Sequence, residues 1–225
     1  MTDPLRGLLQ GYYYDVRNHN YIRAETGRFV ARAHIVELME RSVREREERM
    51  VRGVEALAEG RISPNVFVAR SQTMLKRQYL QERALARGGW DRLTEKDLTE
   101  VAQRLTPEFE RLIKLAGELQ EGKASMAQGQ NRMHMYLGHA RAEFLQVERE
   151  EQAVLPYGLV RIERRVLEPA EHCEDCLEYY ERGWQPEGQL PLPTQDSRCD
   201  GNCRCRLERR VVSSEEAEEL MGTKA

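Results

Sequence analysis

Apolar residues recur at intervals of three and four between residues 31 and 60, and Glu and Arg fill most of the positions between them. This spacing places the apolar side chains along one face of a helix. Gly60 suits the position just after a helix, and Ser63 followed by Pro64 is a typical helix start. The pattern therefore predicts a long amphipathic helix, followed by a second one that runs to Arg87.

Three further helices are expected in the middle of the chain. Thr94 and Asp97 have the spacing of a capping box, which predicts a short third helix. Pro107 suits the first turn of a helix and is expected to begin a fourth, and Ser125 is expected to cap a fifth. Residues 31–155 are therefore predicted to form a five-helix domain with short connections.

The polar positions of these helices suggest no special chemistry. Residues 44–49 read Arg-Glu-Arg-Glu-Glu-Arg, and we interpret this run as a solvated helix face with ion pairs four residues apart. His134 and His139 lie five residues apart, an interval that does not place two side chains on one helical face. We therefore expect no metal site in the helical domain.

The N-terminal segment has a different pattern. Residues 11–30 contain aromatic and β-branched residues interrupted by two turn-forming sequences, which predicts a small β meander or an extended arm. Side chains alternate along a strand, so the rings of Tyr12, Tyr13 and Tyr14 cannot all lie on one face. At least one ring must find another partner or stay exposed. Either the segment packs on its own domain, or it contacts another chain.

Short alternating segments follow residue 156. Residues 161–167 (RIERRVL) and 206–212 (RLERRVV) are nearly identical, and both contain β-branched residues in an alternating pattern. The two segments bracket every cysteine of the chain. We therefore predict that they pair as antiparallel strands and are held together by whatever the cysteines bind.

All five cysteines fall between Cys173 and Cys205. An odd number of closely spaced cysteines indicates a metal site before a disulfide framework. The Cys-x2-Cys spacing of the first two allows a tight turn to present two thiolates to one tetrahedral zinc. An Asp-Gly-Asn turn after the third would fold the others back onto this pair. We therefore predict one structural zinc, whose candidate ligands are, in order, Cys173 and Cys176, then Cys199 and Cys205, then Cys203.

Other interpretations of the cysteines stay open. Structural zinc accepts four ligands, so one of the five cysteines, or His172, is left over. Disulfides are the competing interpretation and would be favoured in an oxidising environment. An iron–sulfur cluster also needs four cysteines, but the second half of the motif lacks ferredoxin-type spacings. Trp184 lies between the two halves and is expected to cover the cluster.

The expected fold class is α+β and mainly α. It combines a helical body with an N-terminal β arm and a small, zinc-stabilised, β-rich module near the C-terminus. The predicted parts are an arm or β meander over 1–30, a helical domain over 31–155, a cysteine-rich zinc-binding module over 156–212 and an acidic tail over 213–225.

Composition narrows the function classes. Hydrophobic residues make up 40% of the 225 residues, the mean hydropathy is −0.72, and no apolar run approaches the roughly 18 residues of a membrane-spanning helix. Without a signal-peptide pattern the expected compartment is the cytoplasm. A net charge of −3 gives no overall attraction to nucleic acid. The sequence contains no phosphate-binding glycine loop, HExxH motif or nucleophile elbow, so we expect no enzyme.

The cysteine region resembles a known signature. The stretch RRVLEPAEHCEDCLEYYERGWQPEGQLPLP, followed by CDGNCRC, is similar to the C-terminal region of phage Mu F-like minor head proteins, or head morphogenesis proteins. Many of these proteins carry His-Pro just before the terminal Cys-Arg-Cys, where this chain has Asp200-Gly201-Asn202 preceded by Cys199. If that histidine is a ligand in the family, Cys199 takes its place here.

The resemblance implies a low-copy component of a tailed-phage head. It implies assembly in the host cytoplasm, docking on the portal protein or the major capsid protein, retention in the virion in several symmetry-related copies, and contact with packaged DNA. These are expectations about location and partners. The resemblance implies a structural role and no enzymatic activity.

Two functions therefore follow from the sequence. The first is a structural minor head protein whose tail module is stabilised by zinc. The alternative is a zinc-dependent nucleic-acid-binding protein, although residues 156–225 hold ten basic and fifteen acidic residues and Glu163 and Glu208 could neutralise arginines by cross-strand pairing. The basic face of this alternative would consist of Arg161, Arg164, Arg165, Arg204, Arg206, Arg209 and Arg210.

Overall fold

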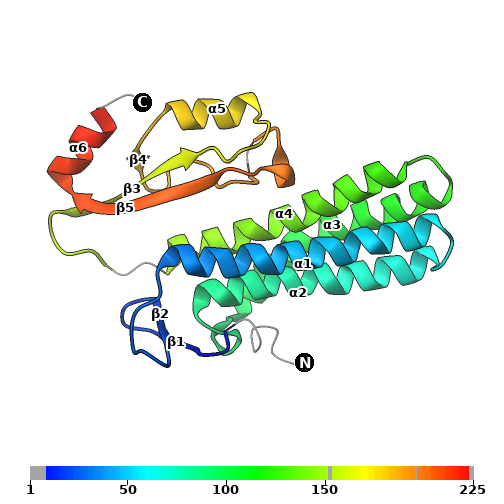
Figure 1. Cartoon of the computed structure of the whole chain (residues 1–225), viewed down its shortest axis with the longest axis horizontal. Coiled ribbons are helices and arrows are strands. Elements are labelled where there is room, and N and C mark those ends of the chain that lie inside the picture. The colour runs from blue at the N-terminus through cyan, green and yellow to red at the C-terminus, as the bar shows by residue number, and fades with distance from the viewer. Residues whose placement is uncertain (1–8, 152–153, 196, 223–225) are drawn as a thin grey trace. The chain divides into compact units, whose positions relative to one another are not determined.

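The computed structural model of the chain describes residues 9–151, 154–195 and 197–222. The fold is α+β and mainly α, as the sequence predicts (Figure 1). It forms two compact units, Met1–Glu151 and Gln152–Ala225, which we call the helical unit and the C-terminal unit. Each unit is described separately below.

Four long helices build the described part of the helical unit, and they run alternately up and down with short connections (Figure 1). A short 3-10 turn, η1 (Trp90–Arg92), lies in the second connection. The helices are α1 (Arg32–Ala58), α2 (Pro64–Arg87), α3 (Glu95–Gln120) and α4 (Met126–Glu150).

Side-chain caps fix three of the four helix starts. The Ser63 hydroxyl accepts a hydrogen bond from the backbone N–H of Val66, and Pro64 occupies the first turn of α2. Thr94 and Ser125 each begin a complete capping box, at the starts of α3 and α4. The caps predicted from the sequence are therefore present.

The prediction of two helices on either side of Pro107 is wrong, because α3 passes through this proline without a break. Pro107 has no N–H to donate to the carbonyl four residues earlier, a loss that usually destabilises a helix by about 3 kcal/mol. Val101, Leu105, Leu112 and Leu115 nevertheless form one buried stripe with helical spacing. Burying this stripe against the other helices requires a continuous helix and offsets the missing hydrogen bond.

The charged run at residues 44–49 is only partly a solvated face. Glu48 lies 4.0 Å from Arg52 in the expected exposed pair. Arg46 instead donates to the Gln81 side chain on α2 at 2.6 Å, and Glu47 is buried. Two of these six charged positions therefore face neighbouring helices, which the alternation of signs alone does not reveal.

A network of ion pairs crosses the interior where α2, α3 and α4 meet. The guanidinium of Arg83, which is fully buried, donates to Asp97 at 3.0 Å, to Glu100 at 2.6 Å and to Glu143 at 2.9 Å. Asp97 and Glu143 are also fully buried. Each has a second arginine partner, Arg87 at 2.8 Å and Arg104 at 2.6 Å. One buried cation thus holds carboxylates from two other helices.

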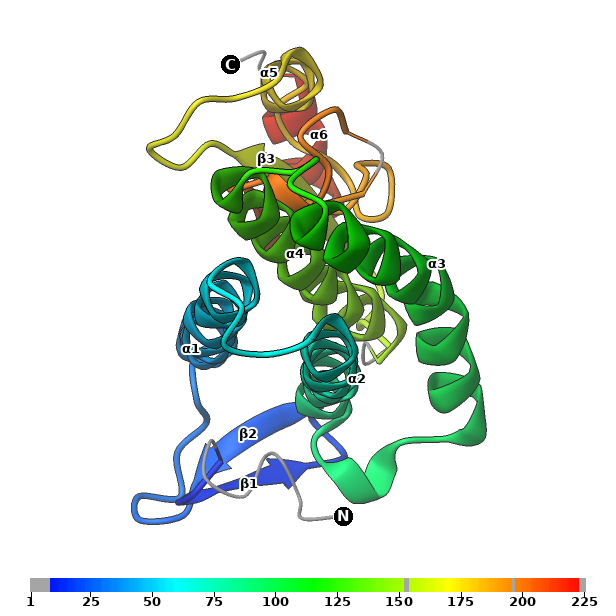
Figure 2. The same cartoon turned by 90° about the vertical axis from the view of Figure 1, so that its right-hand side faces the viewer.

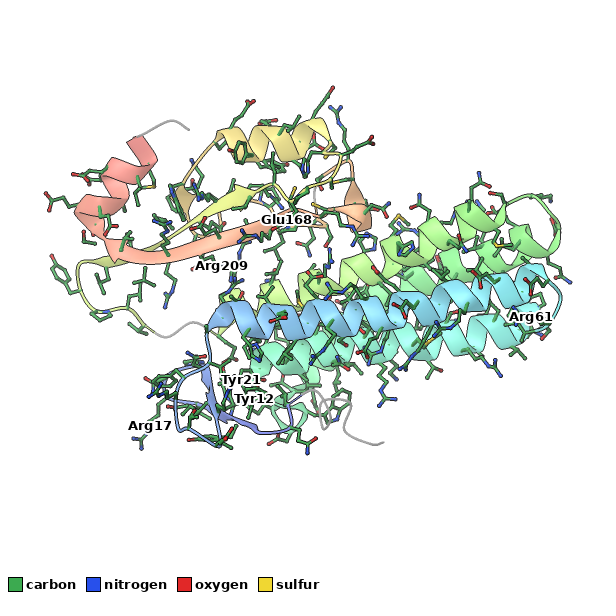
Figure 3. The ribbon with its side chains drawn as sticks, viewed as in Figure 1. Tyr12, Arg17, Tyr21, Arg61, Glu168 and Arg209 are labelled. Atoms are coloured by element: carbon green, nitrogen blue, oxygen red, sulfur yellow. The ribbon has the colours of Figure 1, made fainter. Side chains whose placement is uncertain are left out.

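Strands β1 (Tyr12–Asp15) and β2 (Asn20–Arg23) form an antiparallel hairpin beside the start of α1 and the end of α2 (Figure 2). The Tyr21 hydroxyl donates to the Leu85 carbonyl at 2.7 Å, and the Tyr12 hydroxyl lies 2.8 Å from His34 Nε2 (Figure 3). The segment therefore packs on its own helices, which was one of the two alternatives. Tyr13 and Phe29 keep 50% and 56% of their surface exposed.

Gly88, at the end of α2, is expected to tolerate substitution poorly. Its φ is +88°, and an added Cβ would lie 2.2 Å from the ring of Tyr14. Gly60 also has a positive φ, +72°, but nothing lies within 4 Å of its Cβ position. We expect Gly60→Ala to lower the free energy of unfolding by about 1–2 kcal/mol through backbone strain, and Gly88→Ala to lower it by about 1–3 kcal/mol more through overlap. Chemical denaturation of both variants measures the difference, and equal losses would contradict the Tyr14–Gly88 contact.

The C-terminal unit contains a three-stranded antiparallel sheet in the order β4-β3-β5. Two helices and a 3-10 turn accompany the sheet. The elements are β3 (Leu159–Val166), α5 (Glu174–Glu181), β4 (Gln185–Pro186), η2 (Asp200–Asn202), β5 (Arg206–Ser213) and α6 (Ser214–Gly222).

The near-identical segments of the sequence form the predicted antiparallel pair, β3 with β5. Their register runs from Leu159 opposite Ser213 to Val166 opposite Arg206. Arg164 and Glu208 are cross-strand partners, and their charged groups lie 2.6 Å apart. Glu163 lies opposite Arg209 in the same register, so the glutamate of each segment faces an arginine of the other.

Trp184 does not cover the cysteines, contrary to the prediction. It packs in a separate small core with Ile162, Val212 and Ala217. The guanidinium groups of Arg164 and Arg210 lie over its ring, each at 4.8 Å from the centroid. Trp184 is close to the cysteines along the chain, but closeness in sequence does not determine which core the indole ring joins.

Helix α6 occupies the region that the sequence set apart as an acidic tail. The side chain of Ala217 in this helix is buried, and Leu220 and Met221 pack against the small core that contains Trp184. The acidic residues fill the other positions of an amphipathic helix. Within the described residues this segment is thus part of the C-terminal unit.

Candidate metal centre

Helix α5, the turn η2 and the start of β5 present the five cysteines, which we call the cysteine cluster. Cys173 is the N-cap of α5, and Cys176 lies in the first turn of that helix. Cys199 and Cys203 flank the 3-10 turn η2, and Cys205 directly precedes β5. The turn reverses the chain, so the second half of the motif faces the first. The sequence-predicted ligands are therefore brought together.

The sulfur atoms of the cysteine cluster lie in two triangles that share one residue. The first triangle is Cys173, Cys176 and Cys199, and the second is Cys176, Cys203 and Cys205; in each, all sulfurs are within 4.8 Å of one another. Cys199 Sγ lies 3.4 Å from the Sγ atoms of both Cys173 and Cys176, and Cys176 Sγ lies 3.6 Å from Cys203 Sγ.

These spacings fit a thiolate-bound metal ion. Tetrahedral zinc with Zn–S bonds of about 2.3 Å places its sulfur ligands about 3.8 Å apart. The measured separations of 3.4–3.6 Å are close to this value. A disulfide would require about 2.05 Å, and all five cysteines are free thiols. The cysteine cluster can therefore hold a metal ion.

The accessible surface differs between the triangles. All three cysteines of the second triangle are buried, whereas Cys173 and Cys199 of the first are half-buried. The side chain of Leu167 packs against the sulfurs. The second triangle is thus enclosed by protein, and the first reaches the surface.

Without a cation the five thiols differ in acidity: the pKa values of Cys173 and Cys203 are lowered, and those of the other three cysteines are raised. A hydrogen bond from the thiol of Cys205 lowers the pKa of Cys203 to about 4, and backbone N–H groups contribute. The same contact raises the pKa of Cys205, and burial raises the pKa of Cys176 to about 11. Burial also raises the pKa of Cys199. A bound dication would reverse these upward shifts, because it favours the ionised form of every sulfur.

His172, which the sequence analysis weighed as a donor but did not place in the predicted ligand set, is a polar neighbour of the cysteine cluster. Its Nε2 donates to the Glu168 carbonyl at 2.7 Å, and its Nδ1 lies 3.5 Å from Cys205 Sγ. The only signal in the sequence is its position immediately before Cys173.

Ion pairs fasten the loop that carries Cys199 to helix α5. The backbone N–H of Arg198 donates to the Asp175 carboxylate at 2.7 Å. The Arg198 guanidinium pairs with the carboxylates of Glu174 and Asp175. These contacts hold the two halves of the cysteine motif in register.

The two histidines that the sequence analysis considered as a metal pair, His134 and His139, have other partners. His139 Nδ1 lies 2.8 Å from Glu108, and His134 Nδ1 lies 3.6 Å from Glu47. Within the described part of the chain, the groups with metal-binding geometry consist of cysteines.

None of the described helices combines the length and apolar character needed to cross a bilayer. Comparisons of the chain with models of protein families, with curated proteins and with solved structures found no match.

Proposed function

We propose that this chain is a structural minor head protein of a tailed phage, with a C-terminal unit stabilised by zinc. The observation that carries the proposal is the convergence of Cys-x2-Cys and Cys-Arg-Cys, the motifs that resemble the head-protein signature, in one cluster. The cluster lies in a unit that forms its own compact body. The proposed location is the phage head, after assembly in the host cytoplasm.

Zinc is the proposed metal because of the donor set. Thiolate-rich, tetrahedral sites favour zinc among the common divalent ions, and structural zinc sites are usually closed to solvent. When bound, zinc would hold α5, η2 and the start of β5 together. It would supply no catalytic chemistry, since its role is to stabilise the fold.

The hairpin supplies the proposed docking surface for the portal or the major capsid protein. Tyr13, Val16 and Phe29 are at least half exposed, although the other hairpin tyrosines pack on the helices. Phe29 also borders a shallow groove with Arg23 and Arg28. Exposed aromatic side chains next to arginines are typical of the central residues of protein interfaces.

The nucleic-acid alternative is less well supported because four of the seven arginines of the predicted basic face have acidic partners. Arg164 and Arg210 lie 2.6 Å and 2.9 Å from Glu208, and Arg209 lies 3.4 Å from Glu187. Arg206 pairs with Glu168 at 2.5 Å. An arginine that is already paired with a carboxylate neutralises DNA phosphates poorly. It therefore releases few of the counterions condensed on DNA and contributes little to the binding free energy.

Incorporation into particles tests the proposed function. We expect the double variant Tyr13→Ser/Phe29→Ser to be lost from heads assembled with the cognate portal and major capsid proteins, because it removes the exposed aromatic surface. Ile113→Ser is the matched control, since Ile113 on α3 is also 56% exposed. Quantitative mass spectrometry of purified heads gives the copy number per particle. Absence of the unmodified chain from heads would contradict the proposed function, and normal incorporation of the double variant would contradict the docking surface.

A further inference from the structure

A short segment that follows the hairpin, residues 28–30, extends its sheet by one edge, which we call the Phe29 edge. Phe29 lies opposite Ile22 of β2 in an antiparallel pair, and hydrogen bonds of 2.9 Å and 2.8 Å join the residues on either side of this pair. In a pair of this type the N–H and C=O of the central residue point away from the neighbouring strand. The backbone groups of Phe29 therefore face outward, and neither has a hydrogen-bond partner among the described residues.

Two arginines lie opposite each other at the Phe29 edge. The register of the Phe29–Ile22 pair places Arg28 opposite Arg23, on the same face of the sheet. Both side chains are exposed, and within the described part of the chain neither guanidinium has a carboxylate partner. Like charges directly opposite each other destabilise a sheet. Negative charge placed between the two arginines would relieve this repulsion.

A groove of about 360 Å³ adjoins the Phe29 edge. Its lining contains basic and apolar residues and no acidic residue. The Phe29 side chain is 56% exposed, so its ring offers apolar surface beside the two arginines. The basic groups come from Arg23, Arg28 and His34, and the apolar surface comes from Phe29, Val30 and Ala31.

We propose that the Phe29 edge binds an extended segment of a partner protein in which acidic and apolar residues alternate. The segment adds as a strand beside residues 28–30, where the N–H and C=O of Phe29 supply the hydrogen bonds. Because side chains alternate along a strand, its apolar side chains lie on the side of the Phe29 ring and its carboxylates on the side of Arg23 and Arg28. The inference rests on the proposed docking role of the hairpin and gives the chemistry of the partner.

The backbone of the Phe29 edge favours a peptide over nucleic acid. A peptide strand offers both an acceptor for the Phe29 N–H and a donor for the Phe29 carbonyl. A phosphodiester backbone offers acceptors only, so it would leave that carbonyl without a donor. The two arginines attract both kinds of anion, and the edge therefore determines the choice between them.

Binding of a synthetic peptide tests the inference. The probe is a fluorescein-labelled octapeptide of alternating Glu and Val, titrated with the full chain at low salt and followed by fluorescence anisotropy. We expect saturable binding that Arg28→Glu weakens by about tenfold or more, because the substitution replaces attraction by repulsion. Arg70→Glu is the matched control, since Arg70 is an exposed arginine on α2, and it should bind as the unmodified chain does. The same peptide methylated on every backbone nitrogen should not bind, because it has no N–H to donate to Phe29.

An exchange of charges separates loss of binding from loss of folding. The double variant Arg23→Glu/Arg28→Glu is expected to bind an octapeptide of alternating Lys and Val, which the unmodified chain should not bind. Equal binding of the Lys–Val and Glu–Val peptides by the unmodified chain would overturn the inference, as would no binding of the Glu–Val peptide. Tighter binding of an eight-nucleotide oligothymidylate would overturn it in favour of nucleic acid. These results leave the proposed function standing, whereas absence of the unmodified chain from heads overturns the proposed function whatever the peptide binds.

Discussion

Removal of metal by a chelator is expected to unfold the C-terminal unit and to leave the helical unit folded. The buried apolar core of the C-terminal unit around Trp184 is small, and its other centre consists of the cysteine cluster. Structural zinc contributes about 10–16 kcal/mol in small zinc-binding folds, which is as large as the whole stability of a typical domain. The helical unit has its own core, formed by all four long helices.

Hydrogen exchange measured by mass spectrometry separates the two units. After chelation, protection should disappear from β3, β5 and α6 and persist in α1–α4. Cys176→Ser should reproduce this loss without a chelator, because Cys176 belongs to both triangles. Val211→Thr is the control, since Val211 lies on β5 and is 51% exposed. Full protection of β3 and β5 in verified metal-free protein would contradict the stabilising role of the metal.

Replacement of Arg83 by methionine is expected to lower the free energy of unfolding of the helical unit by about 3–5 kcal/mol. The substitution keeps most of the side-chain volume but removes the cation that contacts Asp97, Glu100 and Glu143. Asp97 and Glu143 are fully buried, so they cannot be solvated in its place. Arg87 still pairs with Asp97, and Arg104 still pairs with Glu143. These remaining ion pairs limit how much the free energy of unfolding falls.

Arg61→Met is the matched control for this experiment. Arg61 also pairs with a glutamate, Glu59 at 2.5 Å, but both side chains are more than half exposed. An exposed pair contributes at most about 1 kcal/mol. Urea denaturation followed by the helical circular dichroism signal compares the two variants. Similar losses for both would show that the buried network contributes no more than a surface ion pair.

The helix boundaries could be predicted because local side chains determine them. Ser63, Thr94 and Ser125 cap their helices through residues only three positions away. Pro107 lies inside α3 for a reason that is not local, namely the burial of apolar residues on both sides of it against other helices. The partners of Arg83 on α3 and α4 were not predictable either, since they lie 14 to 60 residues away.

The candidate metal centre shows the same division between local and distant information. The sequence identified all five cysteines and the strand pair that flanks them, because spacing and near-identity are visible along the chain. It could not show that the sulfurs form two triangles, since this depends on the distances across the fold. The orientation of His172 depends on the carbonyl of Glu168, and a backbone partner leaves no mark in the sequence.

The pairing of β3 with β5 also affects how this unit could move between proteins. Leu159 and Ser213 lie opposite each other, so the chain enters and leaves the cysteine-bearing fold at the same place. A fold with adjacent entry and exit points can be inserted into a surface loop of another protein with little distortion of the host. Residues 159–213 contain all of the candidate ligands, so one inserted segment would transfer them together. Helix α6 would have to accompany this segment, because Ala217 belongs to the core around Trp184.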